Sequence, residues 1–460
     1  MVTPAFLVGV VSAGLLLAPS FLLAATMPAA SKPNILFILA DDLGYGDLRC
    51  YGRDDVRTPV LDQLAADGVR LTQCYANGPE CTPTRAAFMT GRYQQRVGGL
   101  ECAIGTGNVG RYDDAVRLRE THDLGLPVEE TSIARMLRDA GYATALCGKW
   151  HLGYEPKFAP NKHGFDHAFY CIGGGMDYFH HVETNGAPAL YLDGKPIRRE
   201  GYFTDLVTDD AIRFIERGDR KPFFLCLAYT APHSPFQGPK DFRPTPLAAD
   251  SPLQEQGKAP REVYVAMIER MDQCIGRVLD ALDRRRLADN TVVIFTSDNG
   301  GTRSARNAPF SGTKGSTFEG GIRVPGIVRW PEKIPRGIVS EQVCITMDFT
   351  ASILRVAGAQ PPAGRKLDGI DVLQLLETNN PPLPRTLFWR QRRGDRTWWA
   401  VRDGTLKLVR QANGTDITEN LFDLAADAAE KNDLLKQKPE EVARLKKLLA
   451  AWETDVKPRR

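Results

Sequence analysis

Apolar residues in this chain gather in short runs that each end in polar side chains. Four such runs stand out, and each is nearly continuous in apolar residues rather than alternating: 34–40, 142–147, 223–229 and 291–296. This pattern is typical of strands in a parallel sheet that is buried on both faces. We therefore predict four buried parallel strands.

Helical patterns separate these runs. Residues 59–67, 131–140 and 261–285 carry apolar positions at three- and four-residue steps, as expected for one apolar helix face. Strands that alternate with helices indicate an α/β sheet with helices on both faces. Ligands of such sheets bind beyond the carboxyl ends of the strands, so we expect the polar clusters after the four runs to share one pocket.

The last part of the chain has a different pattern. A further helix is predicted at 348–358, and a segment rich in Pro, Gly and Asn follows it. Residues 398–402 and 406–409 then predict a hairpin that turns at Asp403-Gly404, and 439–452 predicts a closing helix. We expect a large, mostly parallel central sheet flanked by helices in a main domain (31–375), and a smaller C-terminal α+β domain with an antiparallel sheet (376–460).

The first thirty residues differ from the rest. Residues 6–25 are almost wholly apolar, and small residues follow at 29–31. This resembles a secretory signal peptide (1–30), with a retained membrane anchor as the alternative. No later apolar run approaches the roughly 20 residues of a membrane span. We expect an exported protein, periplasmic or secreted, with no stable membrane insertion after signal removal.

Composition and charge are those of a globular protein. The net charge of +3 over 460 residues is too small to indicate a nucleic-acid partner. The nine cysteines form no Cys-x-x-Cys pair, so neither a zinc site nor a thioredoxin-like site is supported, and any disulfide pairing stays open.

Two of the predicted strands are followed by oxygen-bearing side chains. Asp41 and Asp42 come after the first strand, and Asp298 and Asn299 come after the fourth. Hard cations such as Ca²⁺ or Mg²⁺ prefer such ligands, and the predicted sheet would bring the two pairs together. We favour a metal site, although Asp298-Asn299-Gly300 alone would also suit a turn.

Basic and imidazole side chains follow the other strands and the adjacent loops. The candidates are Arg85, Lys149, His151, His233 and Lys314. A histidine near a strand end often has only a structural role. Together with a metal, however, this group would bind a tetrahedral oxyanion and neutralise charge as a bond breaks.

Cys81 stands among polar neighbours at the start of a predicted helix, Pro83–Thr90. The free N–H groups at a helix start favour anions. From position alone, Cys81 would be a helix cap, one half of a disulfide or a thiolate nucleophile.

The stretch Cys81-Thr-Pro-Thr-Arg85, followed by Thr90-Gly91-Arg92, resembles the signature of the formylglycine-dependent sulfatases, members of the alkaline-phosphatase-like superfamily. Further parts of the family pattern appear in the same order within 32–358: Asp41-Asp42, Gly148–Gly153, Pro232-His233, Asp298–Gly300, and Lys314 before Thr317–Gly321. The resemblance implies a calcium-dependent sulfuric ester hydrolase with the alkaline-phosphatase-like fold.

The resemblance also implies a role for each residue. A formylglycine-generating enzyme would oxidise Cys81 to Cα-formylglycine, whose hydrate attacks sulfur with one hydroxyl and expels sulfate with the other. Asp41, Asp42, Asp298 and Asn299, together with position 81, would hold Ca²⁺. Arg85 would stabilise the hydrate, Lys149 would bind a sulfate oxygen, and His151 would assist the elimination. His233 and Lys314 would face the leaving oxygen, with His233 as proton donor.

The substrate is less defined. The family implies a sulfated carbohydrate, and we expect the Gly-rich loop 172–181, with His180, His181 and Arg303, at the pocket rim. Aryl sulfates would serve as model substrates. Three alternatives remain: a phosphomonoester or phosphonate monoester hydrolase of the same superfamily, a non-catalytic glycan-binding protein, and a thiol hydrolase or redox protein.

Overall fold

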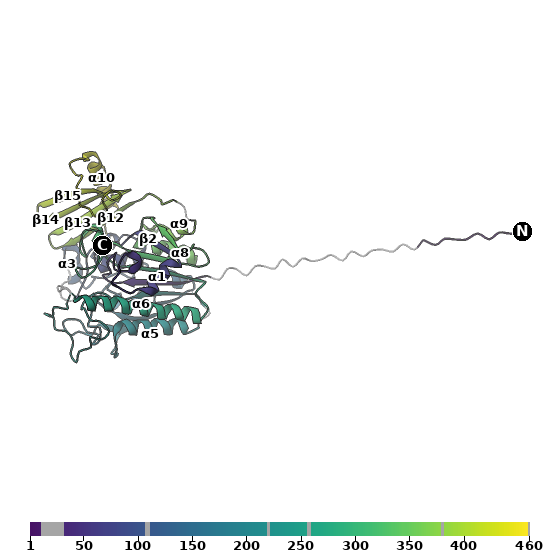
Figure 1. The fold of residues 1–460 in the computed structure, drawn as a ribbon, viewed down its shortest axis with the longest axis horizontal. Coiled ribbons are helices and arrows are strands. Elements are labelled where there is room, and N and C mark those ends of the chain that lie inside the picture. Colours follow the sequence, from purple (N-terminus) through teal and green to yellow (C-terminus); the bar gives the residue numbers. More distant parts are fainter. Residues whose placement is uncertain (11–31, 106–110, 219–220, 255–258, 379–380, 459–460) are drawn as a thin grey trace. The chain divides into compact units, whose positions relative to one another are not determined.

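A computed structural model describes residues 1–10, 32–105, 111–218, 221–254, 259–378 and 381–458 (Figure 1). Residues 32–460 form one compact unit, separate from 1–31. Most of the predicted signal peptide (1–30) lies outside the described residues, and this prediction stays untested. Within the described ranges, no helix combines the length and apolar character that a membrane span requires.

The four predicted strands form the centre of the main sheet. They are β1 (Asn34–Ala40), β3 (Ala143–Lys149), β7 (Phe223–Ala228) and β8 (Thr291–Ser297). They lie in the order β8-β1-β7-β3, and all three pairings are parallel. Every residue of these strands is buried, which explains why their sequences read as continuous apolar runs.

The sheet extends on both sides with strands that the sequence analysis did not predict. Next to β8 lie β9 (Arg323–Arg329) and β2 (Val69–Tyr75), both in antiparallel pairings, and β2 also pairs with β10 (Ile338–Ser340) and β11 (Cys344–Ile345). Next to β3 lie β4 (His167–Cys171), β5 (Leu190–Leu192) and β6 (Lys195–Pro196). The result is an eleven-stranded, mostly parallel sheet, as predicted.

Helices cover both faces of this sheet, because alternate side chains of each strand point to opposite faces. Leu36 and Ile38 of β1 share one core with residues of α1 (Pro59–Ala66), α5 (Phe203–Glu216) and α6 (Arg261–Arg284). Figure 1 shows α5 and α6 side by side along this face. Phe37 belongs to the opposite core, with α2 (Cys81–Thr90), α3 (Asp113–Glu120), α4 (Ile133–Asp139), α8 (Thr346–Ala357) and α9 (Val372–Thr378).

The end of the chain forms a second sheet. Its strands are β12 (Thr386–Arg393), β13 (Arg396–Asp403), β14 (Leu406–Asn413) and β15 (Asp416–Asp423), all antiparallel in chain order, followed by α10 (Pro439–Asp455). The predicted hairpin corresponds to β13 and β14, and the predicted closing helix to α10. Trp389 and Val401 share a core with Tyr75 and Met347 of the main part. The predicted boundary at 375/376 falls inside α9 and stays a prediction.

Candidate active site

The carboxyl ends of β1 and β8 bring the four predicted oxygen ligands together. Ala40 and Ser297 are register partners, so the residues that follow them leave the sheet side by side. Asn299 Nδ2 donates to Asp42 Oδ1 at 2.7 Å, and the Asp42 amide donates to Asp298 Oδ1 at 3.3 Å. Asp41, Asp42, Asp298 and Asn299 are all at most 1% exposed.

Two of the predicted cations lie against these carboxylates. Lys149, the last residue of β3, places Nζ 2.6 Å from Asp41 Oδ2. Arg85, on α2, donates from Nε to Asp298 Oδ2 at 2.9 Å and from an Nη to the carbonyl of Lys149 at 2.8 Å. Charges from four separate elements therefore meet in one buried cluster.

The ionisation of these groups reflects both burial and pairing. Burial and the neighbouring Asp298 carboxylate raise the pKa of Asp41 well above its usual value. Burial opposes ionisation of Asp298 too, but Arg85 and Lys149 outweigh it and lower the pKa of this carboxyl. Burial works against the charge of Lys149, yet Asp41 and Cys81 together outweigh it and raise the Lys149 pKa. The two aspartates repel each other, and this repulsion favours a cation between them.

Lys314 and His233 meet at Asp42. Lys314 Nζ lies 3.0 Å from Asp42 Oδ2 and 3.1 Å from His233 Nε2. His233 Nε2 in turn lies 3.6 Å from the same carboxylate oxygen, and its Nδ1 faces the carbonyl of Ser234. A proton on Nε2 would therefore be directed toward the same space as the Lys314 ammonium.

His151 follows β3, two residues after Lys149. Its Nε2 faces the carbonyl of Ile104, and its buried Nδ1 has no hydrogen-bond partner within the described residues. Burial, and then the charge of Lys149, lowers the pKa of His151 well below its usual value. His151 is therefore neutral at neutral pH.

Cys81 is the first residue of α2 and lies in the same cluster. Its sulfur groups with carboxylate oxygens of Asp41 and Asp298 within 4.8 Å of one another. Burial raises the pKa of the Cys81 thiol to about 12, although Lys149 and Lys314 act in the opposite direction. The unmodified thiol is protonated at neutral pH, which disfavours the thiolate nucleophile.

The donor set fits a hard divalent cation. Asp41 Oδ1 and Asn299 Oδ1 are buried, and neither accepts a hydrogen bond from any described residue. Buried polar atoms normally have partners, so two such oxygens on residues that follow neighbouring strands are consistent with a bound ion. Ligands of this kind are those that Ca²⁺ prefers.

A second group of ligand-type side chains lies elsewhere, where α5 packs on β3 and β4. Cys147 Sγ and His167 Nε2 both contact Asp210 Oδ2, at 3.3 and 2.6 Å, and Arg213 donates to Asp210 Oδ1 at 3.0 Å. Hydrogen bonds from these three residues satisfy Asp210 without an ion.

A cleft of 810 Å³ leads to the cluster, with Cys81, His151, His233 and Lys314 among its lining residues. Its lining also includes residues that the sequence analysis missed: Glu80, Arg111, Glu183 and Arg393. Gly174 to Asp177 belong to the Gly-rich loop that we expected there. Arg393 comes from the C-terminal sheet, and no local sequence signal indicated it.

Three residues expected at the rim do not line this cleft. His180 Nε2 contacts the carbonyl of Arg243, and His181 Nε2 contacts that of Gly201. Arg303 is also absent from the lining. The cleft lining therefore includes Gly174 and Gly175 of the expected loop, but not His180 or His181 at its end.

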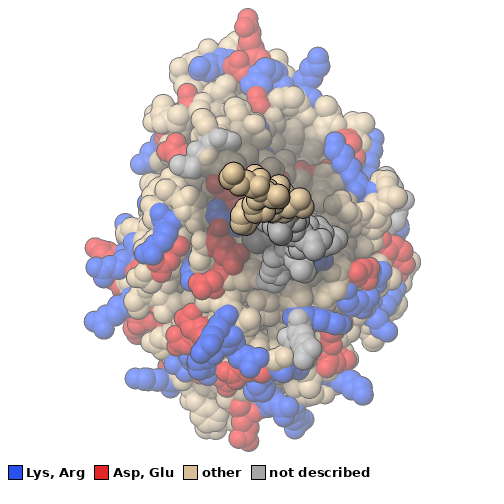
Figure 2. All heavy atoms as spheres, turned by 90° about the vertical axis from the view of Figure 1, so that its right-hand side faces the viewer, with Lys and Arg blue, Asp and Glu red and all other residues tan. Residues whose placement is uncertain are grey.

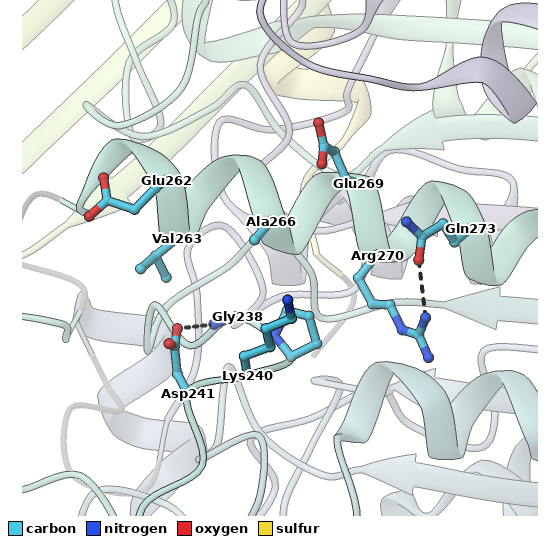
Figure 3. A pocket seen from close by; sticks show the side chains of 10 residues that line it. Gly238, Lys240, Asp241, Glu262, Val263, Ala266, Glu269, Arg270 and Gln273 are labelled. Atoms are coloured by element: carbon cyan, nitrogen blue, oxygen red, sulfur yellow. Dashed lines mark hydrogen bonds between the residues drawn. The ribbon is translucent and has the colours of Figure 1, made fainter.

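Another pocket, of 500 Å³, lies along α6 and is shown in Figure 3. In this pocket the Gly238 amide donates to Asp241 at 2.7 Å and Arg270 donates to Gln273 at 3.0 Å. Arg270 also pairs with Asp205 of α5, at 2.7 Å. No predicted site residue lines it. On the face shown in Figure 2, basic and acidic side chains are interspersed, in line with the small net charge.

Comparisons with known proteins show the family to which this chain belongs. The family model described as sulfatase matches residues 33–359, and the model described as N-sulphoglucosamine sulphohydrolase, C-terminal, matches residues 313–455. The chain is 33% identical to the steryl-sulfatase of Homo sapiens over 78% of this chain and 72% of that protein. It is 35% identical to the N-acetylgalactosamine-6-sulfatase of Canis lupus familiaris over 75% of this chain and 66% of that protein.

Among solved structures, Ps i-CgsB in complex with k-i-k-neocarrahexaose is 31% identical, with a TM-score of 0.78 over 92% of this chain and 93% of that chain. The fold and site define an alkaline-phosphatase-like hydrolase with a buried acidic cluster. This chain belongs to the sulfatase family, whose members hydrolyse sulfate esters.

Proposed function

We propose that this protein releases inorganic sulfate from a sulfated carbohydrate. The observation that carries the proposal is the position of Cys81, which lies at the base of an 810 Å³ cleft and within 4.8 Å of carboxylates that suit a cation. The Lys149 ammonium contacts Asp41 of this group, and the Lys314 ammonium contacts the adjacent Asp42. This arrangement combines a place for a nucleophile, a metal and an anion.

Position 81 would act after conversion to Cα-formylglycine by a formylglycine-generating enzyme. Once formed, that group supplies a hydrated aldehyde, whose paired hydroxyls serve as nucleophile and as the means of releasing sulfate. The sequence around it, with Pro83 and Arg85, carries the motif that such an enzyme reads. The buried, protonated thiol supports this proposal, because it would be a poor nucleophile itself.

Asp41, Asp42, Asp298 and Asn299 would hold Ca²⁺ together with position 81. The ion would act as a Lewis acid toward a sulfate oxygen and lower the pKa of the nucleophile. The two buried oxygens of Asp41 and Asn299 that accept no hydrogen bond from described residues support this assignment.

The fixed cations orient the sulfate group and the nucleophile. Arg85 is held by Asp298 and by the Lys149 carbonyl, so its guanidinium is directed toward position 81 and stabilises the hydrate. Lys149, held by Asp41, binds a sulfate oxygen. Such preorganised charges need no reorientation as negative charge develops.

Two other groups handle the leaving oxygen. His233 Nε2 holds the proton that this oxygen receives, and the Lys314 ammonium 3.1 Å away favours release of that proton. His151, which is neutral, accepts a proton during the elimination of sulfate.

The cleft rim favours a polar, sugar-like substrate over an apolar one. Glu80, Arg111, Glu183 and Arg393 offer charged groups for ring hydroxyls or further anionic groups. The likeness to Ps i-CgsB, which was solved in complex with k-i-k-neocarrahexaose, supports the same substrate class. We further propose that the protein is exported to the periplasm or secreted, where such polymers are found.

Mass spectrometry of the peptide that contains Cys81 tests the proposal, after expression with and without a formylglycine-generating enzyme. We expect formylglycine and sulfate release only in the first preparation. Sulfate release by protein with an intact thiol would overturn the assignment of Cys81. An aryl phosphate tested beside the matching aryl sulfate distinguishes the phosphatase alternative, because faster cleavage of the phosphate would contradict a sulfatase.

A further inference from the structure

A buried lysine of the C-terminal sheet joins two buried glutamates. Lys407 Nζ lies 2.8 Å from Glu319 Oε1 and 2.9 Å from Glu430 Oε1. Lys407 and Glu319 have no exposed surface, and Glu430 is 6% exposed. Lys407 belongs to β14, whereas Glu319 begins the short helix α7 (Glu319–Ile322) of the main part.

Glu319 is held on every side. Its second carboxylate oxygen accepts hydrogen bonds from the Tyr75 hydroxyl at 2.6 Å and from Arg323 at 3.1 Å. Its backbone amide donates to Glu430 Oε2 at 2.6 Å. The position of Glu319 is therefore fixed by groups from the C-terminal sheet and from the main sheet together.

Glu319 lies in the same segment of the chain as Lys314. We call residues 311–321 the lysine loop. On the side of the C-terminal sheet, Ser311 Oγ donates to the carbonyl of Ala429, and Thr317 Oγ1 donates to that of Trp399 at 3.4 Å. The lysine loop is thus attached to the C-terminal part of the chain through Ser311, Thr317 and Glu319.

On the other side, backbone hydrogen bonds attach the lysine loop to the active site. The Lys314 amide donates to Gly301 O at 3.0 Å, and the Gly315 amide donates to Pro79 O at 2.7 Å. The Gly300 amide donates to Gly321 O at 2.9 Å. The partners of these bonds lie within two residues of the proposed metal ligand Asn299 and of Cys81.

The loop has little room to adapt. A Cβ atom on Gly321 would lie 2.0 Å from the Ser316 carbonyl, and one on Gly300 would lie 2.0 Å from the Gly320 carbonyl. Interiors packed this closely transmit a displacement rather than absorb it. A shift of Glu319 would therefore move the backbone that carries Lys314.

We propose that Lys407 is a positioning residue for Lys314: by binding Glu319 and Glu430 it fixes the lysine loop, and so places the Lys314 ammonium beside His233 and Asp42. Without Lys407, two buried carboxylates would face each other with no cation between them, an arrangement that is strongly unfavourable. This inference rests on the proposed role of Lys314 at the leaving oxygen.

Hydrogen exchange of the lysine loop tests the positioning directly and needs no turnover. In Lys407→Met we expect exchange in 311–321 to be about tenfold faster, while the central strands keep their protection. Arg385→Met is the matched control: it removes another nearly buried cation next to the C-terminal sheet, one that pairs with Asp348 of α8 rather than with the lysine loop. Unchanged exchange in 311–321 of Lys407→Met would overturn the proposal.

Restoring the charge balance provides a second test. Adding Glu430→Gln to Lys407→Met removes one of the two opposed carboxylates, and we expect it to return most of the protection of the lysine loop. If Lys407→Met does not fold, the single variant Glu430→Gln serves instead, and we expect faster exchange in 311–321 there as well. A loop as protected in that variant as in the wild type would contradict the proposal.

Turnover separates this inference from the proposed function. In Lys407→Met, a misplaced Lys314 should slow sulfate esters with poor leaving groups by about 10²-fold and activated aryl esters far less. If the lysine loop exchanges faster but both ester types slow equally, Lys407 keeps its positioning role. The role of Lys314 at the leaving oxygen would then be rejected. A loop with wild-type protection would reject the positioning role whatever the rates.

Discussion

At the residue scale, Asp42 is the point where the two groups that we assign to the leaving oxygen meet. Lys314 Nζ and His233 Nε2 both approach its Oδ2, at 3.0 and 3.6 Å. The same aspartate accepts from Asn299 on its other oxygen. One buried carboxylate therefore links the proposed metal site to the proposed proton donor. Changing His233 or a metal ligand singly should separate proton donation from metal binding.

Replacing His233 by Ala should affect substrates unequally. A sugar sulfate has a poor leaving group that needs a proton, so we expect its kcat to fall by about 10²- to 10³-fold. An activated aryl sulfate leaves without protonation and should slow by less than about tenfold. Rates for a series of esters of graded leaving-group pKa measure the difference. His180→Ala, outside the cleft, is the control, and uniform slowing of the series would reject His233 as the donor.

The proposed metal ligands make a prediction that does not depend on activity. Asp41→Asn removes one charge of the oxygen cluster, so we expect Ca²⁺ affinity measured by calorimetry to fall by about 10²-fold or more. In the wild type, Ca²⁺ at 100 times its Kd should add about 2.7 kcal/mol to the free energy of unfolding, and a chelator should remove this. Asp139→Asn, at a 69% exposed side chain, should leave both quantities unchanged. A wild type that binds no Ca²⁺ would contradict the metal assignment.

At the element scale, the site is built where parallel strands end. β1, β3, β7 and β8 are neighbours, and each delivers its predicted residues to the same edge of the sheet. That much followed from the sequence, because buried parallel strands have continuous apolar runs and their carboxyl ends coincide. The sequence did not predict which charged groups pair. Only the folded chain shows that Lys149 contacts Asp41 and that Arg85 contacts Asp298.

The sequence analysis missed several elements because no clear local pattern specifies them. β12 and β15 contain Arg, Asp and Glu at several positions and alternate only partly, because each is an edge strand of the C-terminal sheet. β2 and β9 pair antiparallel inside a mostly parallel sheet, which no local pattern specifies. Arg393 reaches the cleft only because the C-terminal sheet docks on the main part, and such docking depends on tertiary packing.

The loop after β8 gives a prediction about backbone packing. In Gly300→Ala, the new Cβ would lie 2.0 Å from the Gly320 carbonyl, so the Asn299 loop or the lysine loop must move. We expect a loss of about 2–4 kcal/mol in the free energy of unfolding, together with weaker Ca²⁺ binding. Gly105→Ala is the control, because a Cβ there meets no atom of a described residue within 4 Å. Stability and Ca²⁺ affinity equal to the wild type in Gly300→Ala would show that this contact is not restrictive.

At the scale of the whole molecule, buried charges join the C-terminal sheet to the sheet that carries the site. Lys407 and Arg402 of the C-terminal sheet contact Glu319 and Tyr75 of the main part. Arg402 donates to the Tyr75 hydroxyl at 2.6 Å. Breaking such a network costs more than breaking surface pairs, because the remaining charges stay out of water. The C-terminal sheet should therefore contribute to activity although it carries none of the proposed catalytic residues.

The same network should set the acid stability of the protein. Burial alone would raise the pKa of Glu319, but Lys407 and then Arg323 outweigh it and lower this pKa from 4.5 to about 2. A carboxyl whose pKa is lower in the folded state stabilises the fold above its unfolded pKa, and this stabilisation is lost as pH falls from 4.5 toward 2. Glu430 acts in the opposite direction, since burial raises its pKa despite Lys407.

Denaturant unfolding at a series of pH values measures this contribution. We expect the wild type to lose stability between pH 5 and pH 3 more steeply than Glu319→Gln, which has no charge to protonate there, by an amount on the order of 1 kcal/mol. Glu129→Gln, at an exposed glutamate, should follow the wild-type curve. Parallel curves for the wild type and Glu319→Gln would mean that protonation of Glu319 does not limit acid stability, and that the Lys407 contact is offset by the cost of burying its partners.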